Sequence, residues 1–181
     1  MKVVRAAIRA GGHRPDFRVV EFSVQSNHVH LLVEADGAAS LTRGMIGVEV
    51  RLARRINRAL GRSGAFFADR YHARSLRTPA EVRAAIRYVL FNNRHHGSSG
   101  SARDAFVTRA GRTFALDPCS SAPWFEGWAS GSHPPEPWEK QMVGQGRPHA
   151  RATVWLLTTG WRRHGLLARD ELPGPRSRYL T

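Results

Sequence analysis

The chain has 181 residues, with 28 Lys or Arg against 14 Asp or Glu, so its formal net charge is +14 and its isoelectric point is about 11.6. This length fits one domain, or a domain of about 100–150 residues with an appended segment. Nearly all the positive residues are arginine, whose planar guanidinium pairs with two phosphate oxygens. The excess favours a nucleic-acid partner over a merely solvated arginine-rich surface.

Cysteine content and the N-terminal residues exclude several classes of protein. Cys119 is the only cysteine, so neither an intrachain disulfide nor a multi-cysteine metal site can form. Lys2, Arg5 and Arg9 interrupt every apolar run near the N-terminus, which excludes a secretory signal. No stretch approaches the roughly 18 apolar residues that a membrane span needs. We therefore expect a cytoplasmic protein with no membrane contact.

The first elements in the chain are a helix and two strands. Residues 3–10 form a short helix that is closed by Gly11 and Gly12. Residues 18–24 alternate with period two, which predicts a half-buried strand with Val20, Phe22 and Val24 on one face. Residues 28–33 follow a polar turn and should pair with this strand as an antiparallel hairpin.

A long basic helix should follow the hairpin. Ser40 is a suitable N-cap, and apolar residues recur at helical spacing up to about Leu60. The opposite face carries Arg43, Arg51, Arg54, Arg55 and Arg58. Such a face is a candidate DNA-binding surface, although a solvated helix face has the same pattern.

The next segment holds a short strand and a second long helix. Residues 72–76 predict the strand. Thr78, Pro79 and Glu81 form a capping box that opens a helix running to about His95 or His96. Residues 1–97 should therefore form one domain. Residues 98–181, which contain many prolines, glycines and tryptophans with little periodicity, should form an irregular appendage that packs on it or extends it.

Four residues could carry chemistry. His28 and His30 lie on one face of a predicted strand and could close on one divalent cation, although two surface histidines on an exposed strand give the same pattern. Tyr88 and Asn92 stand four residues apart and therefore share a helix face. Two imidazoles and one amide oxygen suit Mn²⁺ or Mg²⁺. Tyr88 could instead pack as an aromatic residue on the sheet.

Two segments of the chain resemble the REP-associated tyrosine transposases (RAYT-like), within the single-tyrosine HUH transposase superfamily. They are residues 24–32, which contain His-Val-His, and residues 88–92, which read Tyr-Val-Leu-Phe-Asn. In that family a His-hydrophobic-His pair lies on a central strand, and a helical tyrosine is followed at four residues by Asn or Gln. Residues 67–72 look like the Arg-Tyr segment that precedes the family's last sheet strand. The resemblance covers about residues 17–97.

The resemblance implies a ferredoxin-like α/β (α+β) fold, an antiparallel sheet with helices on one face, which usually dimerises. The chain opens almost directly in a helix, so the first edge strand of that fold should be missing, and Asn93 stands where relatives often have proline. The family assignment makes His28, His30 and Asn92 metal ligands and Tyr88 the nucleophile. Arg70, in the Arg-Tyr segment, is a further candidate DNA contact.

The function that this implies is a metal-dependent transesterase that cleaves and rejoins single-stranded DNA near hairpins through a 5′-phosphotyrosine link. Tyr71 is a competing nucleophile, but no amide follows it at one helical turn. The alternative is a domesticated or truncated relative that binds structured DNA or RNA through its arginine-rich helix without cleavage. A metal-dependent hydrolase of small phosphates is a third hypothesis, but it would not need such a charge.

Overall fold

The computed structural model describes residues 1–92, 116–131 and 135–171. Its elements are α1 (Lys2–Gly11), β1 (His13–Arg14), β2 (Phe17–Val24), β3 (Val29–Ala35), α2 (Ala38–Ala59), α3 (Pro79–Phe91), η3 (Ala122–Trp124), α4 (Pro137–Gly144), α5 (Trp155–Thr158) and η4 (Gly160–His164). The three strands form one antiparallel sheet in the order β1-β2-β3. The predicted α+β class, the hairpin and the first two helices are therefore confirmed.

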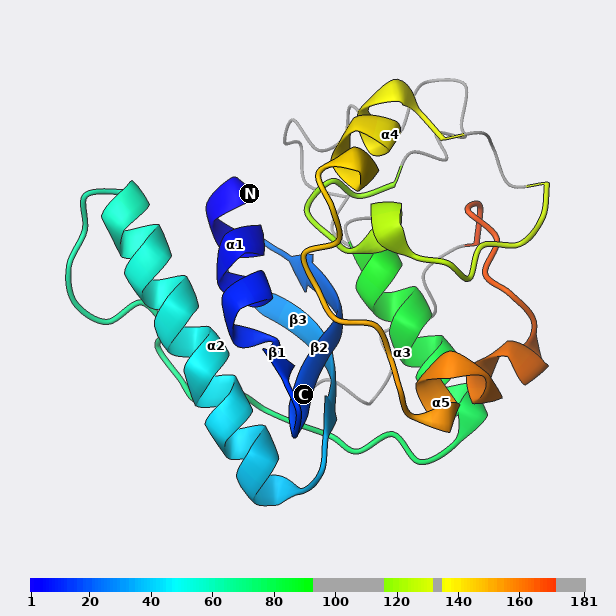
Figure 1. Ribbon diagram of the computed structural model, residues 1–181, viewed down its shortest axis with the longest axis horizontal. Coiled ribbons are helices and arrows are strands. Elements are labelled where there is room, and N and C mark those ends of the chain that lie inside the picture. The colour runs from blue at the N-terminus through cyan, green and yellow to red at the C-terminus, as the bar shows by residue number, and fades with distance from the viewer. Residues whose placement is uncertain (93–115, 132–134, 172–181) are drawn as a thin grey trace.

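Helices cover both faces of the sheet, whereas the prediction placed them on one (Figure 1). Leu31 and Val33 pack with α1 and α2, and Leu32, between them in β3, packs with α3. The central strand β2 also differs from the predicted half-buried strand, because every residue from Val19 to Ser23 is buried. A central strand with no solvated face needs cover on both sides.

A register shift between Val19 and Glu21 interrupts the alternation of β2. Val19 and Phe22 consequently share the core under α1 and α2, although they stand three positions apart. Val20 is not part of that core, so the predicted common face of Val20, Phe22 and Val24 is wrong for Val20. An inserted residue reverses the side-chain direction beyond it, and periodicity cannot show where the insertion falls.

α2 starts three residues before the predicted position, at Ala38. Its N-cap is Gly37, without a side-chain hydrogen bond, and Ser40 lies within the first turn, where its hydroxyl accepts from Arg43 at 3.5 Å. The predicted Ser40 N-cap is therefore wrong. Met45, Val48 and Leu52 are buried at the predicted helical spacing.

α3 begins as the capping box predicts. The Thr78 hydroxyl accepts from the Glu81 backbone N–H at 3.2 Å, and the Glu81 carboxylate accepts from the Thr78 N–H at 3.1 Å. The predicted helix end at His95 or His96, and the predicted domain boundary after residue 97, lie outside the described residues.

Residues 72–76 do not form the predicted strand. They are one wall of a cleft whose other wall is β3, and β3 pairs only with β2 within the described sheet. A strand needs a neighbour that completes its ladder of hydrogen bonds, and local sequence does not supply one.

Residues 116–171, where described, pack on the sheet edge that β1 leaves open. β1 pairs only with Phe17 and Arg18, and beyond them the Ser121 N–H donates to the Phe22 carbonyl at 2.9 Å. The Ala150 N–H likewise donates to the Val19 carbonyl at 2.8 Å. No helix in the described part of the chain is long and apolar enough to span a membrane.

Candidate active site

The two histidines meet at the beginning of β3. His28 Nε2 and His30 Nε2 lie 3.0 Å apart, and the two rings stand edge to face with their centroids 4.6 Å apart. Both side chains are half-buried on the sheet face that α3 covers. β3 begins at Val29, so His30 lies on the strand and His28 immediately precedes it. The spacing of two residues still places both rings on one side.

Asn27 orients the first histidine. Its side-chain oxygen lies 2.7 Å from His28 Nδ1. An amide oxygen can only accept, so in a neutral imidazole Nδ1 carries the proton and the lone pair is on Nε2. Asn27 belongs to the polar turn before residues 28–33, and its role beside His28 was not predicted. Its position directly before the first histidine was the available signal.

Tyr88 reaches the same place from α3. Val82, Ile86 and Leu90 of this helix are buried in the core, while Tyr88 lies half-buried towards β3. Its hydroxyl is 3.4 Å from His30 Nε2, and the two rings are edge to face with centroids 5.0 Å apart. Two histidines and a tyrosine from distant parts of the sequence therefore form one cluster.

Tyr71, the competing nucleophile, contacts a different helix. Its hydroxyl is 3.3 Å from the Thr42 hydroxyl of α2, and its ring packs against the core beneath α1 and α2. The structure thus joins Tyr88 to His30 and Tyr71 to α2.

Asn92 is the C-cap of α3 and is fully buried. In the described part of the chain neither its Oδ1 nor its Nδ2 has a hydrogen-bond partner. A buried amide without a partner is costly, so such a group in a folded protein requires an explanation. Its position one helical turn beyond Tyr88 is compatible with a ligand that completes the site.

The residues present fit a divalent cation. Two bonds of about 2.1 Å at a right angle put their nitrogens about 3.0 Å apart, which is the separation of the two Nε2 atoms. No group of three His, Cys, Asp or Glu that could hold a metal occurs among the described residues. A third protein ligand would therefore have to be of another kind, and the Asn92 amide oxygen suits Mg²⁺ or Mn²⁺.

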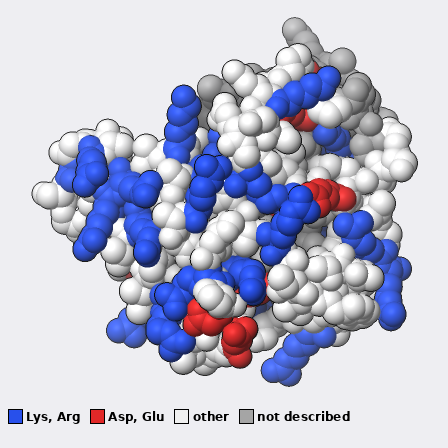
Figure 2. Space-filling model, in the orientation of Figure 1, with Lys and Arg blue, Asp and Glu red and all other residues white. Residues whose placement is uncertain are grey.

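The predicted DNA-binding arginines differ in their surroundings. Arg51, Arg54, Arg55 and Arg58 are exposed on α2, and Figure 2 shows basic side chains gathered over the C-terminal half of this helix. Arg70 is also exposed.

Arg43 is held differently, because it pairs with Asp16 at 3.0 Å. Hydrogen bonds from Arg14 and then Arg43 lower the pKa of the Asp16 carboxyl to about 2. Asp16 therefore stays ionised at neutral pH and partly offsets the charge of Arg43.

Comparison with protein families gives one match. The family described as "Transposase IS200 like" matches residues 2–91. This range contains His28, His30 and Tyr88 and stops one residue before Asn92. Searches of curated proteins and of solved structures found no match.

Proposed function

Because the chain belongs to the IS200-like transposase family, we propose that it is a metal-dependent transesterase that cleaves and rejoins single-stranded DNA next to hairpins. The observation that carries this proposal is the contact of the Tyr88 hydroxyl with His30 Nε2, beside His28. The narrower resemblance to REP-associated enzymes stays a prediction. A homodimer, as the resemblance implies, is part of the proposal.

His28, His30 and Asn92 are the proposed ligands of Mg²⁺ or Mn²⁺. When bound there, such a cation would supply positive charge beside a non-bridging oxygen of the scissile phosphate. Asn27 holds His28 Nδ1 at 2.7 Å and thereby keeps the Nε2 lone pair directed at His30 and the ligand position. The protein's part in this site is to fix the direction and the tautomer of its ligands.

Tyr88 is the proposed nucleophile. Its phenol oxygen forms a bond to the phosphorus while the bond from phosphorus to the 3′ oxygen breaks, which leaves a 5′-phosphotyrosine. The phenol loses its proton and the departing 3′ oxygen gains one, so a free 3′-OH is released. The phosphotyrosine is a diester like the bond it replaces, so another 3′-OH can reverse the step without a nucleotide cofactor.

The proposed DNA contacts are arginines of α2 together with Arg70, which lies in the segment between α2 and α3. Arg51, Arg54, Arg55 and Arg58 are exposed, as is Arg70. Each could neutralise a phosphate and release a counterion. Arg43 belongs to the same proposed surface, but its pairing with Asp16 should make its contribution smaller.

The test is formation of a covalent adduct. A labelled single-stranded oligonucleotide that carries the hairpin flanking the gene, with Mn²⁺ or Mg²⁺, should give a protein–DNA band on a denaturing gel. Tyr88→Phe should abolish the band, a loss of at least about a thousandfold, because only the attacking oxygen is removed. DNA binding should persist in this variant.

Tyr71→Phe is the matched control and should retain the adduct, because the Tyr71 hydroxyl contacts Thr42 and not the histidines. An adduct that survives Tyr88→Phe would contradict the assignment of the nucleophile. Tight binding of the flanking hairpin by the wild-type protein, without an adduct in either metal, would favour the relative that binds without cleavage.

A second experiment concerns the ligands. Asn27→Ala removes the acceptor for His28 Nδ1 and should weaken Mn²⁺ affinity about 10- to 100-fold, as loss of a group that orients a metal ligand does. Asn27→Asp keeps an oxygen at this position and should bind Mn²⁺ at least as tightly as the wild type. Calorimetric titration with Mn²⁺ measures both. Equal affinities for Asn27→Ala and wild type would show that Asn27 has no role in the site.

A further inference from the structure

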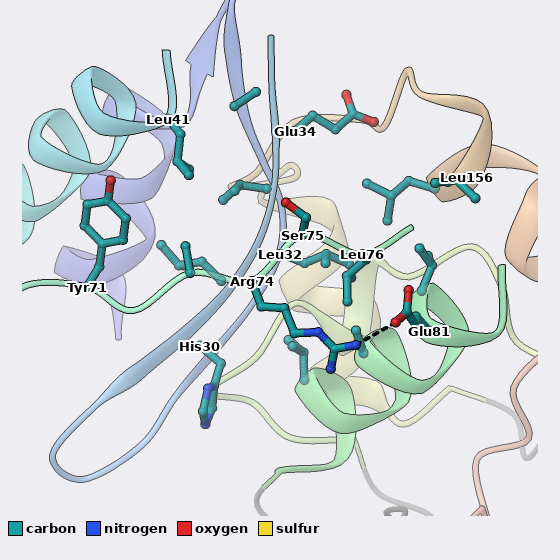
Figure 3. A pocket seen from close by; sticks show the side chains of 18 of the residues that line it. His30, Leu32, Glu34, Leu41, Tyr71, Arg74, Ser75, Leu76, Glu81 and Leu156 are labelled. Atoms are coloured by element: carbon teal, nitrogen blue, oxygen red, sulfur yellow. Dashed lines mark hydrogen bonds and ion pairs between the residues drawn. The ribbon is translucent and has the colours of Figure 1, made fainter. Parts of the chain in front are cut away.

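The short helix α5 borders two hollows in the surface. One is the cleft of about 700 Å³ that His30 and Tyr88 line. Leu156 and Leu157 of α5 line the same cleft (Figure 3). The other is a recess of about 230 Å³, which Leu157 and Arg162 line. Because Leu157 belongs to both hollows, a bound strand that leaves the cleft across α5 reaches the recess.

The recess has an excess of positive charge. Arg147, Arg151 and Arg162 line it, together with Glu21 and Glu126. Burial raises the pKa of the Glu21 carboxyl to about 8, so this group is uncharged at neutral pH. Glu126 pairs with Arg147 at 2.6 Å and with Arg151 at 3.1 Å. The side chains of Arg151 and Glu126 are 73% and 56% exposed, so their pair is weak and a phosphate can replace the carboxylate at Arg151.

The segment that carries α5 and η4 is basic throughout. Residues 151–167 contain three arginines and no Asp or Glu. Arg162 and Arg163 are exposed, and among the described residues neither forms an ion pair. Their guanidinium groups lie over tryptophan rings instead, Arg162 at 5.3 Å from the centroid of Trp161 and Arg163 at 4.9 Å from that of Trp155. No carboxylate therefore offsets these two charges, and a polyanion is the complementary partner.

Trp155 gives this basic surface an aromatic platform. It is 47% exposed, whereas the other four tryptophans are buried or half-buried. The backbone of Gly160 packs against its ring, because a Cβ at Gly160 would come within 2.7 Å of the ring. Unpaired bases stack on aromatic rings and on arginine guanidinium planes, and Trp155 with Arg163 offers both. Bases in a duplex are already stacked on their neighbours, so the platform favours a single strand.

We propose that residues 151–163 form a second contact surface for single-stranded DNA, on which the strand that leaves the Tyr88 cleft continues. A backbone phosphate binds at the recess beside Arg162, and an unpaired base stacks on Trp155. The inference rests on the proposed function, because it takes the cleft as the path of the DNA. It gives a role to a part of the chain that lies beyond the family match to residues 2–91.

Binding of fluorescein-labelled oligothymidine to the full chain, measured by fluorescence anisotropy, tests the surface without any cleavage step. Trp155→Ala should weaken this binding about tenfold, which is the loss typical of one stacked base. Trp155→Phe keeps an aromatic ring and is the matched control, so it should stay within about threefold of wild type. Blunt duplex DNA should bind the wild type and both variants alike, because its bases are not available for stacking.

The salt dependence of the same binding tests the phosphate contact. Arg162→Ala should lower the slope of log affinity against log salt by about 0.7, the contribution of one phosphate on a single strand. Lys140→Ala removes an equal charge from an exposed position of α4 and should leave the slope unchanged. Because both positions are exposed, these two variants keep the test decisive even where Trp155→Ala is not stably folded.

Any of four results would overturn the proposal: no binding of oligothymidine by the wild type, equal binding by Trp155→Ala and Trp155→Phe, an equal loss for duplex DNA, or equal salt slopes for Arg162→Ala and Lys140→Ala. The covalent adduct reports the proposed function separately. Absence of the adduct with the Trp155 effect intact would contradict the transesterase and keep the surface. A normal adduct with unaltered binding by Trp155→Ala would keep the transesterase and remove the surface.

Discussion

The layer formed by α1 and α2 and the layer formed by the C-terminal residues 116–131 and 135–171 stabilise the same sheet by different means. α1 and α2 bury Val4, Ile8, Met45, Val48 and Leu52, and Ser40 is the one polar side chain that they bury. The described C-terminal residues bury Asp117, Ser120, Ser121, Glu139, His149 and Arg169.

Each buried polar group must recover in the protein the interactions that it loses in water. Some do so in pairs, such as Glu139 and Arg169 at 3.0 Å, and Ser121, which bonds the backbone of Phe22. Others do not. Neither ring nitrogen of His149 has a hydrogen-bond partner in the described part of the chain. The helical layer therefore depends almost entirely on apolar packing, whereas the C-terminal layer, which also buries Trp124, Trp161 and Leu167, adds a set of buried polar groups.

The largest effect should come from a change of shape in the helical layer. A Cβ at Gly44 would overlap the ring of Phe17, so Gly44→Ala should destabilise the fold by about 3 kcal/mol. At Gly47 of the same helix, a Cβ would meet only the flexible end of Arg51, at 3.2 Å. Gly47→Ala should be neutral or stabilise by up to about 1 kcal/mol, because alanine favours helix. Urea unfolding measures both, and equal effects would contradict the tight contact of α2 with Phe17.

A smaller effect should follow from removing one polar partner in the C-terminal layer. The Phe22 N–H donates to the Ser121 hydroxyl at 2.9 Å in a buried position. Ser121→Ala leaves this N–H without that acceptor and should cost about 1–3 kcal/mol, although the side-chain volume hardly changes. A loss below about 0.5 kcal/mol in urea unfolding would indicate that water replaces the hydroxyl.

The smallest effect, per unit of pH, should be a dependence of the free energy of unfolding on pH that arises at Glu21 and His149. Burial raises the pKa of the Glu21 carboxyl to about 8, which the Ser121 hydrogen bond partly opposes. Burial, and then the charge of Arg147, lower the pKa of the His149 ring to about 3. Between about pH 4.5 and 8, Glu21 is therefore protonated in the folded protein and ionised in the unfolded chain. Between about pH 3 and 6.5, His149 is neutral in the folded protein and protonated in the unfolded chain.

The signs follow from these directions. The Glu21 contribution is fully present below about pH 4.5 and is lost as the pH rises through about 8. The His149 contribution is present above about pH 6.5 and is lost as the pH falls towards 3. Each group can change the free energy of unfolding by at most about 1.4 kcal/mol per pH unit. Between about pH 4.5 and 6.5 the two changes have opposite signs and offset each other.

Glu21→Gln tests this most directly. The free energy of unfolding of the wild type should fall between pH 6.5 and 8, and Glu21→Gln should flatten this part of the profile. Urea unfolding at half-unit pH steps measures it. Parallel profiles for the two proteins would show that Glu21 ionises in the folded state as it does in the unfolded state.

The same contrast explains which elements could be predicted. The helical layer, the hairpin and the capping box at Thr78 follow from periodicity and from contacts within a few residues. Three other features depend on neighbours that are remote in sequence. They are the bulge at Val19 to Glu21, the absence of a strand at residues 72–76, and the helix cover on the second face of the sheet. Local rules give no information about such neighbours.

At the candidate site, the sequence by itself determined that His28 and His30 share a strand face and that Tyr88 and Asn92 share a helix face, because these spacings follow from strand and helix geometry. Only the tertiary structure decided that Tyr88 meets His30 and that Tyr71 meets Thr42 instead. Whether two elements touch depends on how they pack. The periodic position of a side chain fixes the face of the helix or strand on which it lies, but not the residue that it contacts.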